Sequence, residues 1–423
     1  MKLEITAEND SRIITALLAV SVFFLPIFQI PSLICWIILL LYGILAKNFS
    51  NFIADFKSSP FYILLVSLYL FYLVGMIWTE NTALGWEDLK VKIPLFLFPF
   101  LFLLIPIIKS FYYVLCRSLI FGCLTAVFFC SVRAFMHYRV NHNLQEFYYT
   151  SFSRFLHPTY FTMYINLAML FLMQFILDNT VVSKKVKWYD VFLLFLFSAV
   201  VIVLTARIAM ITTLITLSAY TILELRKRKI VSKFLKELLV GAIIIGVMFF
   251  YLVKVNNRFT QISEVIEKYE NNTELVDTVN NTGYNSTTIR IGLLKNGMEL
   301  FKENPIFGVG TGDLIPESVN CLNRQGLHML AQKSRGPHNQ YLQVAVTLGI
   351  FGFFLFVLCI GWPFIEYLRA KEYLFAAFMV IVMFNAVGDT VLRASSIYFF
   401  TMFGCFFYRN FRSFKVKKVQ KSV

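Results

Sequence analysis

Charged residues are scarce in this chain of 423 residues, because Asp, Glu, Lys and Arg together make up only 15% of it. Soluble globular proteins carry about 25%. Hydrophobic residues make up 58% of the chain and aromatic residues 17%. This composition excludes an ordinary soluble globule. It is typical of a polytopic membrane protein, since apolar runs long enough to cross about 30 Å of hydrocarbon recur along the sequence.

Strand-like segments of about ten residues with alternating polarity are also lacking, which argues against a membrane β-barrel. The bilayer forces apolar spans to be helices, because every backbone polar group must be satisfied internally. We therefore predict an all-α polytopic integral membrane protein with about twelve transmembrane helices. The predicted spans cover residues 13–30, 32–46, 60–78, 93–108, 113–132, 158–177, 190–206, 208–224, 238–255, 340–366, 374–388 and 396–408.

Signatures of disulfide, metal and nucleotide sites are missing as well. Six of the seven cysteines lie in apolar spans and only Cys321 does not, so no disulfide framework is predicted. No Cys-x-x-Cys or Asp-x-Asp pair occurs, and we expect neither a metal nor a cofactor. The run Gly308-Val309-Gly310-Thr311-Gly312 lacks the context of a phosphate-binding loop and is interpreted as a turn. No cleavable signal peptide is evident before the first span.

One long polar interruption, residues 256–337, divides the apolar sequence. It gives three predicted parts: helices 1 to 9 in residues 1–255, a large periplasmic loop with amphipathic helices in residues 256–339, and helices 10 to 12 with a basic cytoplasmic tail in residues 340–423. If the spans alternate, the basic clusters all fall on one side, which the enrichment of Lys and Arg in cytoplasmic loops identifies as the cytoplasm. We expect both termini there. The net charge of +15 then faces anionic lipid rather than nucleic acid.

Several polar residues are predicted on the outer face: Arg207 at a span boundary, and Arg290 within the polar segment 256–337. Arg207 is flanked by apolar residues, and such an arginine is either a functional anion ligand or an interfacial residue that snorkels to water. Arg290 starts a run with helical periodicity, so it either caps a solvated helix or pairs with Arg207 to bind a diphosphate.

Histidines stand before two predicted spans. His338, between Pro337 and Asn339, can act as a general base, since imidazole titrates near neutrality, or it can be an exposed helix-start residue. Arg154 and His157 repeat this combination before Pro158; they either line the same cavity or serve the helix start.

The last outer loop holds Asp389 and Arg393. These two residues either form a local ion pair or orient the residues of the site.

The order of these features resembles the bacterial O-antigen ligases. The resemblance rests on the Arg207 turn, on Arg290 followed by Asn304-Pro305-Ile306-Phe307-Gly308-Val309-Gly310, and on Pro337-His338-Asn339-Gln340-Tyr341 with Leu348-Gly349-Ile350-Phe351-Gly352. Motif-level similarity is concentrated in residues 200–352, while similarity in topology extends over most of the chain. Thr205-Ala206 precedes Arg207 where the family pattern has a serine.

The resemblance implies an inverting, metal-independent transfer of a glycan from undecaprenyl diphosphate to a sugar hydroxyl of lipid A-core. It places the site on the periplasmic side of a bacterial inner membrane. It implies His338 as general base and Arg207 and Arg290 as ligands of the diphosphate, with Arg154 and His157 as further candidates for substrate binding. An O-antigen polymerase or another transferase of the same superfamily, and a membrane transporter, remain alternatives.

Overall fold

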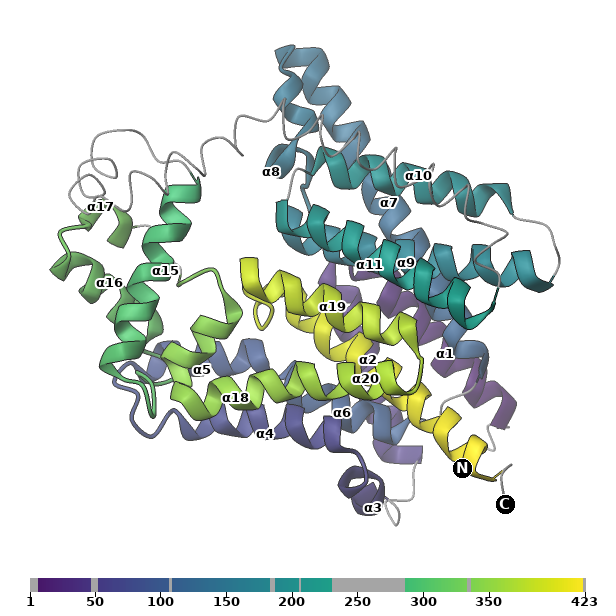
Figure 1. Cartoon of the computed structure of the whole chain (residues 1–423), viewed down its shortest axis with the longest axis horizontal. Coiled ribbons are helices and arrows are strands. Elements are labelled where there is room, and N and C mark those ends of the chain that lie inside the picture. The colour runs from purple at the N-terminus through teal and green to yellow at the C-terminus, as the bar shows by residue number, and fades with distance from the viewer. Residues whose placement is uncertain are drawn as a thin grey trace.

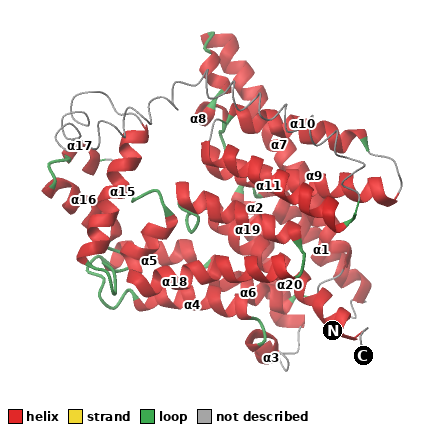
Figure 2. Ribbon diagram, viewed as in Figure 1, coloured by secondary structure: helices red, strands yellow, loops and turns green. Residues whose placement is uncertain are grey.

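A computed structural model describes residues 7–46, 52–105, 109–182, 187–204, 207–229, 286–332 and 336–420. All regular structure in these ranges is helical (Figures 1 and 2). The helices are α1 (Ala7–Phe24), α2 (Gln29–Ala46), α3 (Phe52–Lys57), α4 (Pro60–Val74), α5 (Thr82–Lys92), α6 (Pro94–Leu104), α7 (Lys109–Asn141), the 3₁₀ helix η2 (Leu144–Phe147), α8 (Tyr149–Phe152), α9 (Pro158–Val182), α10 (Trp188–Val203), α11 (Arg207–Lys227), α15 (Ser286–Glu303), α16 (Leu314–Arg324), α17 (His328–Ala331), α18 (Gln340–Arg369), α19 (Tyr373–Gly388) and α20 (Ala394–Gln420).

Eleven of the twelve predicted spans overlap a helix, and the predicted span 238–255 lies outside the described residues. Among the described residues, four helices are long and apolar enough to cross a membrane: α7, α9, α11 and α18. Several other apolar helices, such as α4 and α19, are shorter. The all-helical class is therefore confirmed for the described part of the chain, whereas the number of membrane crossings stays a prediction.

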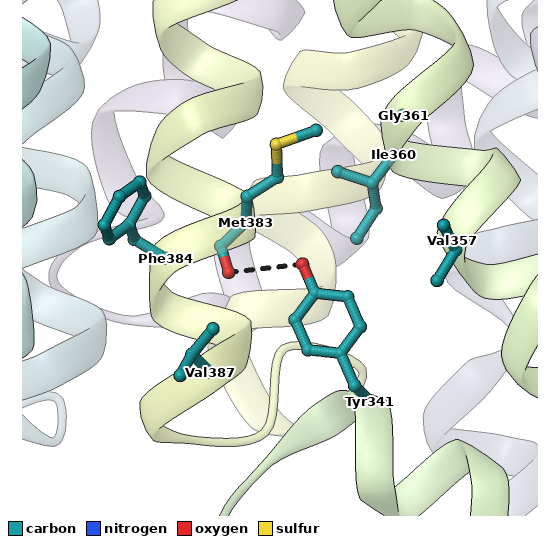
Figure 3. A pocket seen from close by; sticks show the side chains of 7 residues that line it. All are labelled: Tyr341, Val357, Ile360, Gly361, Met383, Phe384 and Val387. Atoms are coloured by element: carbon teal, nitrogen blue, oxygen red, sulfur yellow. Dashed lines mark hydrogen bonds between the residues drawn. The ribbon is translucent and has the colours of Figure 1, made fainter.

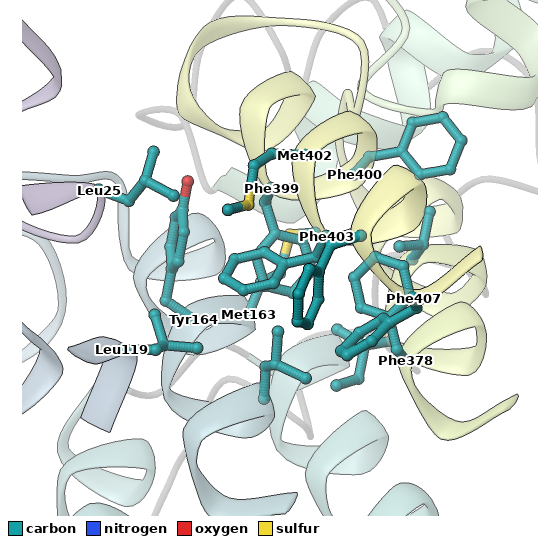
Figure 4. Packing of buried hydrophobic residues seen from close by; sticks show 14 of the residues in the cluster. Leu25, Leu119, Met163, Tyr164, Phe378, Phe399, Phe400, Met402, Phe403 and Phe407 are labelled. Carbon is teal, nitrogen blue, oxygen red and sulfur yellow. The ribbon is translucent and has the colours of Figure 1, made fainter. Parts of the chain in front are cut away.

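Aromatic and aliphatic side chains fill the centre of the helical bundle. Figure 4 shows Phe399, Phe403 and Phe407 of α20 packed against Phe378 of α19 and Met163 of α9. Phe378 and Phe407 have ring centroids 5.0 Å apart in an edge-to-face arrangement, which aromatic pairs favour. All seven cysteines are buried and free, including Cys321, which lies outside the apolar spans. This core ties α9, α19 and α20 together and holds their ends in fixed positions.

Basic residues from separate sequence clusters meet at one end of the bundle. Lys227, at the end of α11, donates a hydrogen bond from Nζ to the carbonyl oxygen of Lys371, in the turn before α19. The opposite end of α19 is Gly388. At 1.5 Å per residue, the 16 residues of this helix separate the two ends by about 24 Å. The predicted outer residues Asp389 and His338 lie at this second end.

The glycine segment 308–312 forms the predicted turn and anchors the polar part of the chain to α18. Gly349 has a φ of +68° inside α18 and kinks the helix. Around the kink, backbone groups of α18 form hydrogen bonds with this part of the chain. Val346 O accepts from Val309 N at 2.8 Å, and Ile350 N donates to Pro305 O at 2.9 Å. A Cβ at Gly349 would lie 2.0 Å from Ile306 O, so only glycine fits this approach.

The same segment also holds α5. Asp313 accepts hydrogen bonds from the backbone N–H groups of Glu80 and Asn81, both at 2.8 Å. Thr311 Oγ1 donates to Tyr72 O. These bonds connect the end of α4, the start of α5 and the start of α16. In Figure 1, α15, α16 and α17 gather at the left of the molecule, beside α5 and the kinked half of α18.

Candidate active site

The centre of the candidate site is the carboxylate of Asp389, which follows the last residue of α19. Its side chain is only 7% exposed. Oδ1 accepts a hydrogen bond from Thr390 N at 2.9 Å and lies 3.4 Å from Nδ1 of His338. Oδ2 lies 3.8 Å from Nδ1 of His157. One carboxylate therefore faces two imidazoles that belong to distant parts of the sequence.

His338 is held in a left-handed backbone conformation, with φ of +49°. This conformation is uncommon for residues other than glycine, although histidine adopts it more readily than most. His338 lies just before α18, and the next residue, Asn339, caps this helix: its Oδ1 accepts a hydrogen bond from Leu342 N at 3.0 Å. Asn339 Nδ2 also donates to Val387 O at 3.0 Å. The cap thus ties the start of α18 to the end of α19, and the two helix ends bring His338 to Asp389.

The electrostatics of Asp389 follow from these neighbours. Burial opposes ionisation of the carboxyl, but the hydrogen bond with His338, the backbone bond from Thr390 and the nearby His157 outweigh it. Together they lower the pKa of Asp389 below its ordinary value. Asp389 is therefore an anion at neutral pH. It orients the imidazole of His338 when Nδ1 carries the proton, which leaves Nε2 as the basic nitrogen.

His157 lies on the segment before α9, between the rings of Tyr149 and Tyr160. Partial burial lowers the pKa of His157 below its ordinary value. The positive charge of Arg290 and the nearby His338 act in the same direction, and Asp389 opposes them. His157 is consequently biased toward the neutral form. Arg154, three residues earlier, is exposed to solvent.

Arg290 reaches the same helix end from the outer helix α15. Its Nη1 donates to Gly388 O at 2.9 Å, one residue before Asp389. A guanidinium has five N–H donors, so this single bond leaves others free to bind an anion. The predicted helical run after Arg290 is confirmed as α15, and the fold places this arginine at the turn that carries Asp389, near His157.

The start of α11 lies against the same turn. A Cβ at Gly388 would lie 2.0 Å from Cδ1 of Ile208, so the glycine allows close contact with the residue after Arg207. Arg207 is the first residue of α11. Its side chain lies outside what the structure describes. The helix end that Arg207 opens is therefore beside Gly388, while the contacts of its guanidinium stay a prediction.

The loop after Asp389 is fixed by bonds from two other helices. Gln340 Oε1, in the first turn of α18, accepts from Leu392 N at 2.8 Å. Tyr160 of α9 and Thr390 share a hydrogen bond of 3.2 Å between their hydroxyl oxygens. No ion pair between Asp389 and Arg393 is present in the described structure. Of the two interpretations of these residues, the structure favours orientation of the site by Asp389.

An apolar pocket of about 260 Å³ begins beside the site and runs between α18 and α19 (Figure 3). The pocket is lined by Val387, Met383 and Ile360. Tyr341 also lines it, and its Oη donates a hydrogen bond to Met383 O at 3.3 Å. Val387 is adjacent to Gly388, to which Arg290 is bound. A charged site and an apolar pocket are thus contiguous at this end of the bundle.

No group of three or more His, Cys, Asp or Glu side chains suited to a metal ion occurs in the part of the chain that the structure describes. The charged groups that surround Asp389 are arginine and histidine. Arg290 keeps N–H donors beyond its bond to Gly388 O, and these donors suit an anionic ligand.

The family model described as O-antigen ligase matches residues 192–357. The match includes Arg207, Arg290 and His338, but neither His157 nor Asp389. The apolar helices and this match support an integral membrane protein, and members of the matched family are membrane glycosyltransferases. The match supports assignment of the chain to the O-antigen ligase family, whose members are ligases or polymerases. No curated protein matches the chain.

Proposed function

We propose that the chain is an O-antigen ligase that transfers a glycan from undecaprenyl diphosphate to a sugar hydroxyl of lipid A-core on the periplasmic face of a bacterial inner membrane. The observation that carries the proposal is the contact of His338 with Asp389, next to the Gly388 carbonyl that binds Arg290. It combines a candidate base with a cation that can hold a diphosphate, which are the two requirements of this transfer.

In the proposed reaction, Nε2 of His338 takes the proton of the acceptor hydroxyl. The acceptor oxygen forms a bond to the anomeric carbon, while the bond from that carbon to the diphosphate oxygen breaks and its electron pair leaves with the diphosphate. A single displacement of this kind inverts the anomeric configuration. Asp389 stabilises the imidazolium that forms, since opposite charges close together favour the charged state.

Arg290 stabilises the negative charge that collects on the departing diphosphate. Arg207 is proposed to bind the same group, because the helix end that it opens packs against Gly388 and helix N-termini favour anions. The neutral bias of His157 suits a ligand that donates or accepts a hydrogen bond, and the exposed Arg154 extends the positive surface. The adjacent apolar pocket suits the first isoprene units of a lipid-linked donor.

The proposal is tested by reconstituting the purified protein with glycosyl undecaprenyl diphosphate and lipid A-core, with a chelator present. We expect lipid A-core carrying the glycan, formed with inversion and despite the chelator. Donor lengthened on its own lipid, without modified core, identifies a polymerase instead. Movement of donor across the membrane of proteoliposomes without any glycosyl transfer identifies a transporter, and either outcome refutes the ligase proposal.

A further inference from the structure

A second cavity, of about 350 Å³, is lined in part by Arg393, in the loop that carries Asp389. Its volume is at the small end of the range of about 300–1,000 Å³ for ligand pockets. Its polar lining comes from Glu87 and Asp88 of α5, from Gln343 of α18 and from Arg393. Leu84 and Val91 add apolar surface. None of these residues belongs to the site described above.

Gln343 contributes an unpaired hydrogen-bond acceptor to this cavity. Its side chain lines the cavity, the residue is only 7% exposed, and its Oε1 accepts no hydrogen bond from the described residues. A buried amide oxygen without a donor costs about 1–3 kcal/mol, so such atoms are rare unless a ligand or water completes them. Oε1 of Gln343 therefore indicates where a hydrogen-bond donor of a bound molecule belongs.

The cavity has a rigid base. Gly312 lines it and packs directly on α5: a Cβ at this position would lie 2.2 Å from Asn81 O and 2.7 Å from Gly85 N. Asp313, the next residue, bonds to the backbone at the start of α5. The polar groups on α5 are thus held at a fixed position relative to α18, as a preformed binding site requires.

The charges in the cavity are nearly balanced. Asp88 is paired with Lys92, which is itself buried. Arg393 offsets Glu87. This balance is poorly suited to a diphosphate, which two carboxylates would repel, and to a divalent cation, which Arg393 and Lys92 would repel. Carboxylates accept, a guanidinium donates and the free amide oxygen accepts, so the complementary ligand is neutral and rich in hydroxyl groups.

The cavity and the proposed base share two structural elements. Gln343 lies five residues after His338 at the start of α18, and Arg393 lies four residues after Asp389 in the same loop. Gln340 joins these elements through its bond with Leu392 N. A ligand in the cavity is therefore positioned by the same helix turn and loop that hold the His338–Asp389 pair.

We propose that this cavity is a glycan subsite, in which the hydroxyl groups of one sugar residue contact Glu87, Gln343 and Arg393 and thereby align the substrate with His338. The inference rests on the proposed function for its meaning in catalysis. The sugar can belong to the lipid A-core acceptor or to the glycan of the donor, and the two sources are distinguished by kinetics.

The test uses the purified protein with both substrates varied independently. Glu87→Gln changes an exposed side chain, and Gln343→Leu removes the orphaned oxygen with little change of volume. Because a typical hydrogen bond is lost, we expect either variant to raise KM for one substrate about three- to tenfold and to leave kcat nearly unchanged. Glu299→Gln, on the exposed face of α15, is the matched control and should behave as wild type.

A raised KM for lipid A-core assigns the subsite to the acceptor, and a raised KM for the donor assigns it to the donor glycan. Unchanged KM values for both substrates in both variants overturn the inference, as does an equal effect in the control. If wild type transfers nothing, the proposed function fails. Binding of free, delipidated core oligosaccharide and of the free O-glycan then decides the subsite: weaker binding of either by Glu87→Gln and Gln343→Leu supports it, and equal binding refutes it.

Discussion

The substitution Asp389→Asn isolates the contribution of the carboxylate charge to the proposed base. Asparagine keeps the shape of the side chain and an oxygen that can accept from Thr390 N. Two unit charges 3.4 Å apart, as Asp389 Oδ1 and protonated His338 Nδ1 are, attract by about 5 kcal/mol at an effective dielectric constant of about 20. The His338 side chain is 29% exposed, so water screens this attraction. Hydrogen bonds to charged groups contribute about 1.5–3 kcal/mol net.

We therefore expect Asp389→Asn to lower kcat about 10- to 150-fold. The assay is transfer by reconstituted protein at saturating donor and acceptor, with thermal unfolding as a check on folding. A double-mutant cycle sharpens the result: if Asp389 acts through His338, adding Asp389→Asn to His338→Ala should cause little further loss. Independent, multiplicative losses in the double variant would refute the reasoning, as would a single variant with the wild-type rate.

Three further predictions concern the surroundings of this pair. Arg290→Ala should lower kcat of the transfer about 100-fold or more. Arg290→Lys should retain part of the rate, because lysine keeps the charge but lacks the planar guanidinium. Full activity of Arg290→Ala in the transfer assay contradicts a role of Arg290 in diphosphate binding. Gly349→Ala should reduce the free energy of unfolding by more than about 1 kcal/mol, because its Cβ meets Ile306 O, whereas Gly361→Ala, which meets nothing within 4 Å, should not; equal unfolding temperatures contradict the clash. The pKa of His157 is lower in the folded chain than its ordinary value of about 6.5, so at a pH just below 6.5 the unfolded chain binds more protons than the folded one. The free energy of unfolding therefore falls as the pH decreases below about 6.5. His157→Gln should reduce this loss in unfolding scans at pH 7 and below, and the control His328→Gln should leave it unchanged.

Long apolar runs were enough to predict the apolar helices, because a bilayer-length apolar run has few other ways to satisfy its backbone. The ends of these helices were harder to predict from the sequence. α7 continues to Asn141, well past the predicted end at residue 132, because helical hydrogen bonding persists after the apolar run gives way to Arg133 and His137. The short helix α5 in the outer segment 79–92 was not predicted, since its polar sequence has no clear periodicity.

The site could be predicted only in part. His338 was identified as a candidate because it stands directly before an apolar span, and Arg290 because it starts a run with helical periodicity in the polar segment. The role of Asp389 was left open, since its contact with His338 depends on how the ends of α18 and α19 pack together. The glycan subsite had no sequence signal, because the unpaired state of Gln343 depends on where α5 and Gly312 lie in the fold.

The central claim is that His338 removes the acceptor proton in a glycosyl transfer. The most direct measurement is the rate of transfer from glycosyl undecaprenyl diphosphate to lipid A-core by reconstituted His338→Ala, compared with His328→Ala, which changes an exposed histidine on α17. We predict that His338→Ala is slower than wild type by about 10²- to 10⁴-fold, as loss of a general base implies, with donor binding retained. His328→Ala should have the wild-type rate. Transfer by His338→Ala at the wild-type rate would contradict the account.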